Sequence, residues 1–295
     1  MIHLSILLAL CSLLFFHRQN TRLAVGVLFL AALVLRYHYI TLDAFLHDWD
    51  ERFHALVAKN MMTEPFKPML RTTPIISYDY TFWRDNHIWL HKQPFFLWQM
   101  ALSMKIFGVS EVTVRIPNML MGSLIVPLIY KTGKNWANER IGFFAAFIGV
   151  FAQYQLQLIS GNMPVEHNDI AFLFYTTASI WAYSEYAISE NKKWKWAILA
   201  GVFAGCAVLC KWLTGLFVFS GWGLALLTQK ENRTLLTNWL HIGTAFLVAC
   251  AVFMPWQIYT YIKFPKESLY ERTYNSRHFT EALEGHNGKW DFYLN

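Results

Sequence analysis

Charged residues are scarce in this sequence. Lys, Arg, Asp and Glu make up 15% of the 295 residues, against about 25% in ordinary soluble domains. The hydrophobic set reaches 55% before the 15 glycines are added, whereas about 45–50% with glycine included is usual. One core in a chain of this length cannot bury that much apolar surface. The composition therefore disfavours a disordered protein, a disulfide scaffold and a nucleic-acid-binding domain, and it predicts a polytopic membrane protein.

Cysteine and linker sequences are also rare. The four cysteines lie within apolar runs, and Cys206 and Cys210 are one helical turn apart, which indicates packing and not a bridge. The first apolar stretch has no preceding basic residue and no small-residue cleavage site, so a removable signal peptide is not expected. Since repeats, low-complexity tracts and Pro/Gly/Ser linkers are absent, residues 1–295 are predicted to form one transmembrane module.

Long apolar runs are what the sequence has in abundance. Eight of them are predicted to be membrane-spanning helices: 2–16, 23–40, 116–130, 141–159, 169–188, 197–210, 212–228 and 239–259. The loops 17–22, 131–140, 189–196 and 229–238 hold ten of the 25 Lys and Arg residues, whereas the short connections 160–168 and 210–212 hold only Lys211. The positive-inside rule places the basic loops in the cytoplasm, so the net charge of +6 does not require nucleic acid. The N-terminus is then expected outside.

Two long hydrophilic segments fall on the outer side in this scheme. They are the loop 41–115 and the tail from Tyr261. Within the loop, 51–62 is predicted to be a helix with Phe53, Leu56, Val57 and Met61 on one face, and a second helix is expected from Pro94 to Phe107. Both are expected to lie on the membrane surface or on the bundle. The segment 64–90 is predicted to be irregular, with a short hairpin at most.

The unusual polar residues all lie toward this outer side. They occur in five places, listed here as motif and position: HDWDERF (Asp48, Asp50, Glu51, Arg52), HKQP (His91, Lys92, Gln93), RIPN (Arg115), VEHND (Glu166, His167, Asp169) and CKWLTG (Lys211). Each motif has a simpler interpretation on its own. Acids such as Asp50 and Asp169 often begin helices, and a lysine at a membrane turn is often an interfacial anchor. Their shared location favours a functional site, because ionisable groups at membrane depth are costly.

Such a site suits a carboxylate base beside a cationic pocket for an anion. A carboxylate can accept the proton of a hydroxyl group, and cations can stabilise a departing phosphate, including one carried by a lipid. His91, His167 and Asp169 are also candidate ligands for a divalent metal, although their spacing is not diagnostic.

The order of these motifs resembles the GT-C integral membrane glycosyltransferases. Within them, the sequence is most similar to the protein O-mannosyltransferase-like and aminoarabinose (lipid A) transferase-like families. The likeness covers residues from about 23 to 295 and is carried by DER at 50–52, KQP at 92–94, RIP at 115–117, the helix beginning near Asp169 and the CKWLTG turn. It implies an all-α transmembrane bundle with a long helical first extracytoplasmic loop, and a polyprenyl-phosphate-linked sugar as donor.

The resemblance also implies roles for individual residues. Asp50 matches the catalytic aspartate, and Asp50 and Glu51 are the predicted catalytic residues. Arg52, Lys92, Arg115 and Lys211 are the predicted phosphate-binding residues, listed by their motifs above. The sequence departs from the family at Gln93, where proline is more frequent, at His91, where the aminoarabinose group often has an acid, and in the altered Thr-Lys-Gly turn around Lys211. It also has fewer spans, so an N-terminal fragment of a longer protein is expected.

The function predicted from the sequence is inverting transfer of a sugar to a hydroxyl of a protein or of a lipid or glycan, on the extracytoplasmic face of a membrane such as the bacterial inner membrane. No cofactor is required, and no glycine-rich phosphate loop is present. The alternative from another class is a transporter or flippase of lipid-linked saccharides, which would use the same cations but no base. A purely structural membrane subunit leaves the acid–base cluster unexplained.

Overall fold

The computed structural model describes residues 1–73, 75–82, 84–161, 166–191, 193–228, 235–277, 280–281 and 283. Within them the chain is helical apart from turns, loops and one isolated β-bridge. The helices are α1 (Ile2–His17), α2 (Thr21–Ile40), α3 (Asp50–Met61), α4 (Pro94–Phe107), α5 (Glu111–Trp136), α6 (Glu139–Val150), α7 (Gln153–Ser160), α8 (Glu166–Ile188), α9 (Lys193–Lys211), the 3₁₀ turn η1 (Trp212–Leu216), α10 (Phe217–Thr228), α12 (Leu236–Lys263) and α13 (Pro265–Arg277). The predicted all-α fold is confirmed.

All eight predicted apolar segments are helical, but they differ in how well they suit a membrane. By length and composition, the described chain has four candidate spans: α2, α5, the stretch Lys193–Thr228 and α12. The predicted span 141–159 is broken into α6 and α7, which meet at a 44° bend and count as a fifth span only together. Helix α1 is shorter than a full crossing, and α8 does not meet the same test.

The chain reverses between α9 and α10, as predicted for residues 210–212. Trp212 has a positive φ of 59°, and Gly215 lies against the backbone of Ala207 and Val208 of the preceding helix. A Cβ at Gly215 would come within 2.6 Å of the Val208 nitrogen, so only glycine allows this approach. Lys211 is therefore at the turn itself.

Small residues bring the bundle helices together. Gly201 and Gly205 of α9 face Ala245, Ala249 and Val252 of α12, and such residues permit the close backbone contact that drives helix association in membranes. Large apolar side chains point the other way. The outward faces of α1 and α12 expose residues such as Leu7, Leu14, Leu247 and Ile258, the pattern expected of surfaces that face lipid.

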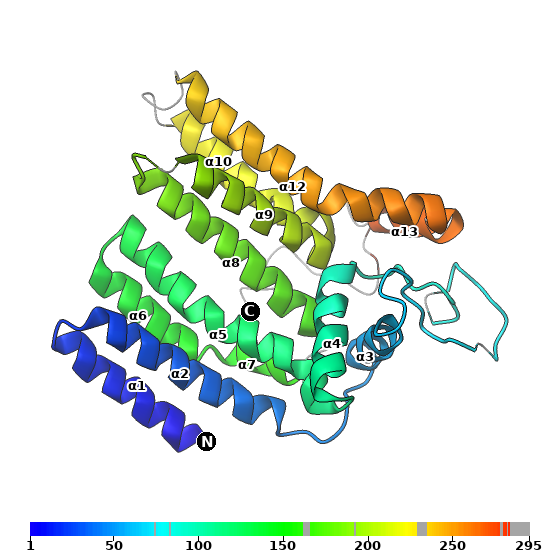
Figure 1. Cartoon of the computed structure of the whole chain (residues 1–295), viewed down its shortest axis with the longest axis horizontal. Helices are drawn as coiled ribbons and strands as arrows, with labels where there is room; N and C mark the ends of the chain where they lie inside the picture. Colours follow the sequence, from blue (N-terminus) through cyan, green and yellow to red (C-terminus); the bar gives the residue numbers. More distant parts are fainter. Residues whose placement is uncertain are drawn as a thin grey trace.

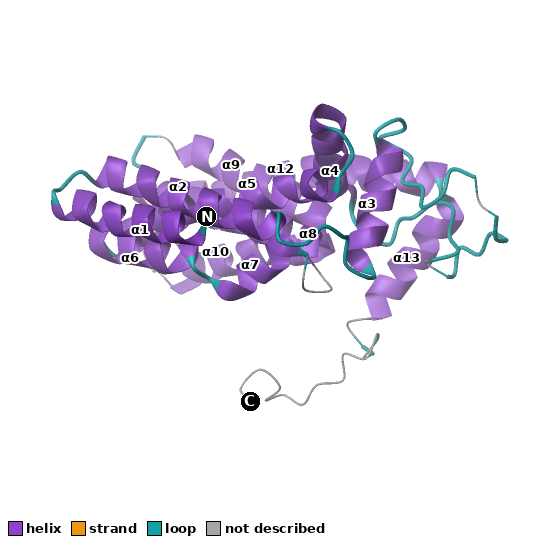
Figure 2. Ribbon diagram, turned by 90° about the horizontal axis from the view of Figure 1, so that it is seen from below, coloured by secondary structure: helices purple, strands orange, loops and turns teal. Residues whose placement is uncertain are grey.

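The two ends of the bundle are different (Figure 1). The long helices run side by side, and the helix ends that the connections α1–α2, α5–α6, α8–α9 and α10–α12 join lie at one end of the bundle. At the other end, α4 lies across the helix ends, and α3, α13 and the extended part of the first loop lie beyond it. Figure 2 shows the same segregation from a second direction. The helix ends that flank the four basic loops thus lie at one end, and α13 and the described part of the first outer loop lie at the other.

The first loop has the two predicted helices. Helix α3 begins at Asp50 and α4 at Pro94, at its N1 position, where the missing N–H costs nothing. Of the four residues predicted to share a face, Val57 and Met61 are buried, Phe53 is half-buried and Leu56 is exposed. Among its described residues, the irregular segment between the helices contains one isolated antiparallel bridge, Met69 to Ile88.

Candidate active site

The first acid–base pair of the site joins α3 to the start of α4. Lys92 Nζ lies 3.5 Å from Asp50 Oδ2, and both side chains are about one-fifth exposed. Asp50 is the first residue of α3, so its carboxylate is at the helix N-terminus, where the helix dipole favours a negative charge. The pair is accessible to a substrate and is not locked into the core.

The second pair joins α8 to the turn after α9. Lys211 Nζ forms an ion pair with Asp169 Oδ1, and the lysine side chain is 43% exposed. Asp169 also interacts electrostatically with Lys92 and with Asp50. The two pairs are therefore neighbours, and the structure brings together four residues that are spread over 162 positions of the sequence, from Asp50 to Lys211.

Behind these pairs, Glu51 and Arg115 form a fully buried ion pair. Arg115 donates through Nε to Glu51 Oε1 at 2.7 Å and through Nη2 to Oε2 at 3.0 Å. Its other N–H groups donate to the carbonyl oxygens of Ile40, Asp43 and Phe45. All five guanidinium donors are thus used.

This geometry favours structural roles for Glu51 and Arg115 over the predicted ones. In this arrangement Arg115 has no guanidinium donor left for a phosphate. Burial would raise the pKa of Glu51, but His167 and the hydrogen bonds from Arg115 outweigh it and lower the pKa to about 2. A carboxylate that is so weakly basic and so enclosed does not suit proton abstraction. Glu51 instead fixes the first turn of α3, and with it Asp50.

His167 and Gly161 complete the enclosure of Glu51. His167 Nε2 lies 3.4 Å from Glu51 Oε1, and its Nδ1 is 2.6 Å from Asn118 Nδ2. The amide must donate in that contact, so Nε2 of His167 carries the proton that faces Glu51. Gly161 ends α7 in a left-handed conformation, and a Cβ there would lie 2.5 Å from Glu51 Oε1. Sequence reasoning did not find Asn118 or Gly161, because their roles depend on packing between helices that are distant in sequence.

Arg52 has a different environment from the two lysines. It is largely exposed, and it pairs with Asp48 at 2.7 Å and donates through Nε to the Leu46 carbonyl at 3.1 Å. It lies at the rim of the site, one residue beyond Glu51. The backbone of Glu166 belongs to α8, but its side chain lies outside the described residues.

The candidate metal ligands are not brought together. His91 lies near Glu271, His167 contacts Glu51 and Asn118, and Asp169 pairs with Lys211. Across the part of the chain that the structure describes, no group of three His, Cys, Asp or Glu side chains has a metal-binding arrangement. The set His91, His167 and Asp169 therefore does not fit a metal ion.

His54 is a buried residue that the sequence did not single out. It is fully enclosed beside Trp89, Phe96 and His167, and both ring nitrogens lack a hydrogen-bond partner among the described residues. Burial, with the nearby Lys92 and histidines, lowers the pKa of His54 well below its usual range. It is thus a neutral core residue behind the site.

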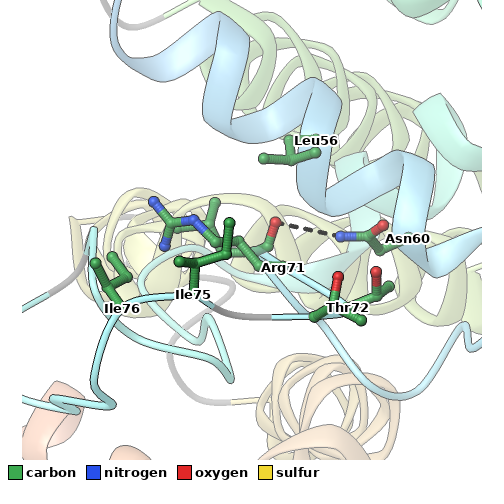
Figure 3. A pocket seen from close by; sticks show the side chains of 8 residues that line it. Leu56, Asn60, Arg71, Thr72, Ile75 and Ile76 are labelled. Carbon is green, nitrogen blue, oxygen red and sulfur yellow. Dashed lines mark hydrogen bonds between the residues drawn. The ribbon is translucent and has the colours of Figure 1, made fainter.

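An open hollow of about 460 Å³ lies apart from the four charged residues, between α3 and the first loop. Figure 3 shows Leu56, Asn60, Ile75 and Ile76 around it. Its cation, Arg71, donates to the Arg84 carbonyl at 2.6 Å. With no carboxylate in its lining, this hollow offers no acid–base chemistry.

Sequence relatives identify the family. The family model for dolichyl-phosphate-mannose-protein mannosyltransferases matches residues 91–259, more than half of the chain. The chain belongs to this family. The match begins at His91 and extends through Lys211, and so includes three of the four residues of the two acid–base pairs.

Individual relatives have low sequence identity to this chain. An uncharacterised protein of Aquifex aeolicus is 24% identical over 220 residues, which cover 75% of this chain and 40% of that protein. The dolichyl-phosphate-mannose–protein mannosyltransferase 2 of Candida albicans is 28% identical over 134 residues, 41% of this chain and 16% of the relative. The chain spans less than half the length of these relatives.

Solved structures show the same fold. ArnT from Cupriavidus metallidurans in the apo state aligns with a TM-score of 0.66 at 19% identity, covering 91% of this chain and 46% of ArnT. The archaeal oligosaccharyltransferase AglB from Archaeoglobus fulgidus, in complex with an inhibitory peptide and a dolichol-phosphate, aligns with a TM-score of 0.54 at 15% identity, covering 88% and 34%. The predicted GT-C fold is confirmed, and so is the resemblance to the mannosyltransferase-like and ArnT-like proteins.

Proposed function

We propose that this chain is the membrane module of a glycosyltransferase that moves a sugar from a polyprenyl-phosphate-linked donor to a hydroxyl group of a protein or of a lipid or glycan. The observation that carries the proposal is the pairing of Asp50 with Lys92 beside Asp169 and Lys211, at one accessible end of a membrane bundle. Family membership supports glycosyl transfer. A second ArnT structure with the same fold holds undecaprenyl phosphate, which supports a lipid phosphate as the donor class.

The proposed reaction uses Asp50 as the general base. The acceptor oxygen attacks the anomeric carbon, its proton passes to the Asp50 carboxylate, and the bond between that carbon and the phosphate oxygen breaks with inversion. The electron pair leaves on the lipid phosphate, whose charge Lys92 and Lys211 stabilise. Arg52 would join them only after it releases Asp48. Glu51, held by Arg115 and His167, keeps Asp50 in place.

The proposed sidedness follows from the charge distribution. The helix ends that flank the basic loops lie at the end of the bundle opposite to the site, and short basic loops remain in the cytoplasm. The site is therefore assigned to the extracytoplasmic side. A polyprenyl chain in the outer leaflet would present its phosphate at this depth.

Binding of undecaprenyl phosphate to the purified protein tests the phosphate site. Wild-type protein is expected to bind the lipid, and Lys92→Met or Lys211→Met should weaken binding about 10- to 100-fold, as expected for one lost charge-assisted hydrogen bond. The matched control is Lys105→Met, which removes a lysine from the exposed last turn of α4. Unchanged binding in both Lys92→Met and Lys211→Met would overturn this phosphate site.

A further inference from the structure

Helix α13 has an unusual buried face. Its buried residues are Glu267, Ser268 and Glu271, and the two glutamates are one turn apart. A helix normally buries an apolar stripe, and buried carboxylates are costly unless they have partners. The question is therefore what holds these two carboxylates.

Their partners come from the first outer loop, about 180 residues earlier in the chain. Tyr78 donates a hydrogen bond to Glu267, and His91 Nδ1 lies 3.6 Å from Glu271 Oε2. Between these contacts, the ring of Tyr80 packs edge-on against Tyr270, with centroids 6.2 Å apart. Figure 1 shows α13 beside this loop, at the end of the bundle that carries the site.

One of the loop residues that contact α13 is next in sequence to the lysine that pairs with the proposed base. His91 precedes Lys92, whose ammonium group pairs with Asp50. Trp89, which is fully buried, lies between the His91 ring and the His54 ring of α3, with centroids 5.7 Å and 5.9 Å away. A change in how His91 sits against α13 can thus reach Lys92 through the peptide bond that joins them, and it can reach His54 of α3 through Trp89.

We propose that α13 is a clamp that positions Lys92, with Glu267 and Glu271 as its positioning residues. The two glutamates hold the loop at Tyr78 and His91, and so fix the lysine that faces the donor phosphate. This role rests on the proposed function. The contacts described for α13 are with Tyr78, Tyr80 and His91 of the first loop. Helix α13 therefore acts on the site through the loop and not by touching the four charged residues.

Hydrogen–deuterium exchange tests the clamp without any activity measurement. Glu267→Gln and Glu271→Gln should raise amide exchange in residues 76–82 and 86–91, with little change in α2 and α5. Tyr78→Phe removes only the hydroxyl donor and should raise amide exchange in residues 76–82 in the same way. This variant keeps the test valid if a glutamate variant does not fold. The matched control is Glu281→Gln, because Glu281 pairs with Arg277 at an exposed site near α13. Unchanged exchange in the loop of all three test variants would overturn the clamp.

A double-mutant cycle on undecaprenyl phosphate binding separates positioning from general damage. Glu271→Gln alone should weaken binding several-fold, and it should have no further effect once Lys92 is replaced by methionine, because coupled sites are not additive. Additive losses would contradict a role through Lys92. If wild-type protein does not bind the lipid at all, the proposed function fails, and the exchange experiment still decides whether α13 holds the loop.

Discussion

Arg115 holds Glu51 through two hydrogen bonds, at 2.7 Å and 3.0 Å, and both side chains are fully buried. The residue next to Glu51 is Asp50, the proposed base. The two adjacent acids therefore lie in different environments. The Glu51 carboxylate is fully buried, whereas the Asp50 side chain is about one-fifth exposed.

Removing one partner of this buried pair should unfold the protein more easily. Glu51→Gln and Arg115→Met are each expected to lower stability by about 3–5 kcal/mol, the usual cost of leaving one buried charge without its partner. Thermal unfolding in detergent measures the change. Asp48→Asn, at an exposed ion pair with Arg52, is the control and should change stability by less than about 1 kcal/mol. Equal stabilities for all variants would contradict the anchoring role.

The stabilising effect of Glu51 should depend on pH in one direction. Its pKa in the folded state is lowered to about 2, below the value of about 4.3 in an unfolded chain. The contribution is therefore fully present above about pH 4.3 and is lost as the pH falls toward 2. Unfolding curves should show that the stability difference between wild type and Glu51→Gln is constant from pH 5 to 8 and shrinks below pH 4. A difference that shrinks above pH 6 would contradict the assignment.

Gly161 should tolerate no side chain. It has a positive φ of 77°, and a Cβ would lie within 2.6 Å of three atoms of the Glu51 carboxyl group. Gly161→Ala is expected to displace Glu51 and to reduce both stability and transfer, whereas Gly26→Ala, in open space on α2, should be nearly neutral. Parallel unfolding and transfer assays make the comparison, and wild-type values for Gly161→Ala would show that α7 does not brace Glu51.

Much of this molecule was predictable from sequence, and the reasons are local. Apolar runs of the right length gave the positions of the helices, and Pro94 marked the start of α4. The break between α6 and α7 was not predicted, because the mostly apolar run 141–159 was expected to form one span, although Gln153, Gln155 and Gln157 interrupt it next to the bend. The burial of Glu51 and Arg115 was not predicted either, because a motif shows which residues are present, whereas the packing around them depends on distant parts of the chain.

The predicted topology can be measured by cysteine labelling. Ser77 and Asn191 are both exposed. Ser77 belongs to the first outer loop and Asn191 to the segment between α8 and α9, and these two segments lie at opposite ends of the bundle (Figure 1). In a variant without the four native cysteines, Ser77→Cys should react with a membrane-impermeant reagent from outside intact cells, and Asn191→Cys should react only after the membrane is opened. Labelling of both positions from the same side of the membrane would contradict the predicted topology.

The proposed phosphate-binding role of Lys211 predicts a loss of catalysis without a loss of folding. Lys211→Met keeps the apolar part of the side chain and removes the charge. Transfer from a polyprenyl-phosphate sugar should fall by roughly 10²–10³, as for other preorganised donors. Lys131→Met, at the opposite end of the bundle, is the control. Wild-type rates in Lys211→Met would make this lysine a membrane anchor only.

The most direct test of the account is turnover by Asp50→Asn with a polyprenyl-phosphate-linked sugar. The variant keeps the shape of the side chain and removes its ability to accept a proton. We predict normal folding, retained binding of undecaprenyl phosphate, and a fall in transfer of at least about 10²–10⁴, with Asp48→Asn near wild type. Transfer at the wild-type rate by Asp50→Asn would contradict the central claim that Asp50 is the base, and would favour a transporter that uses the same lysines.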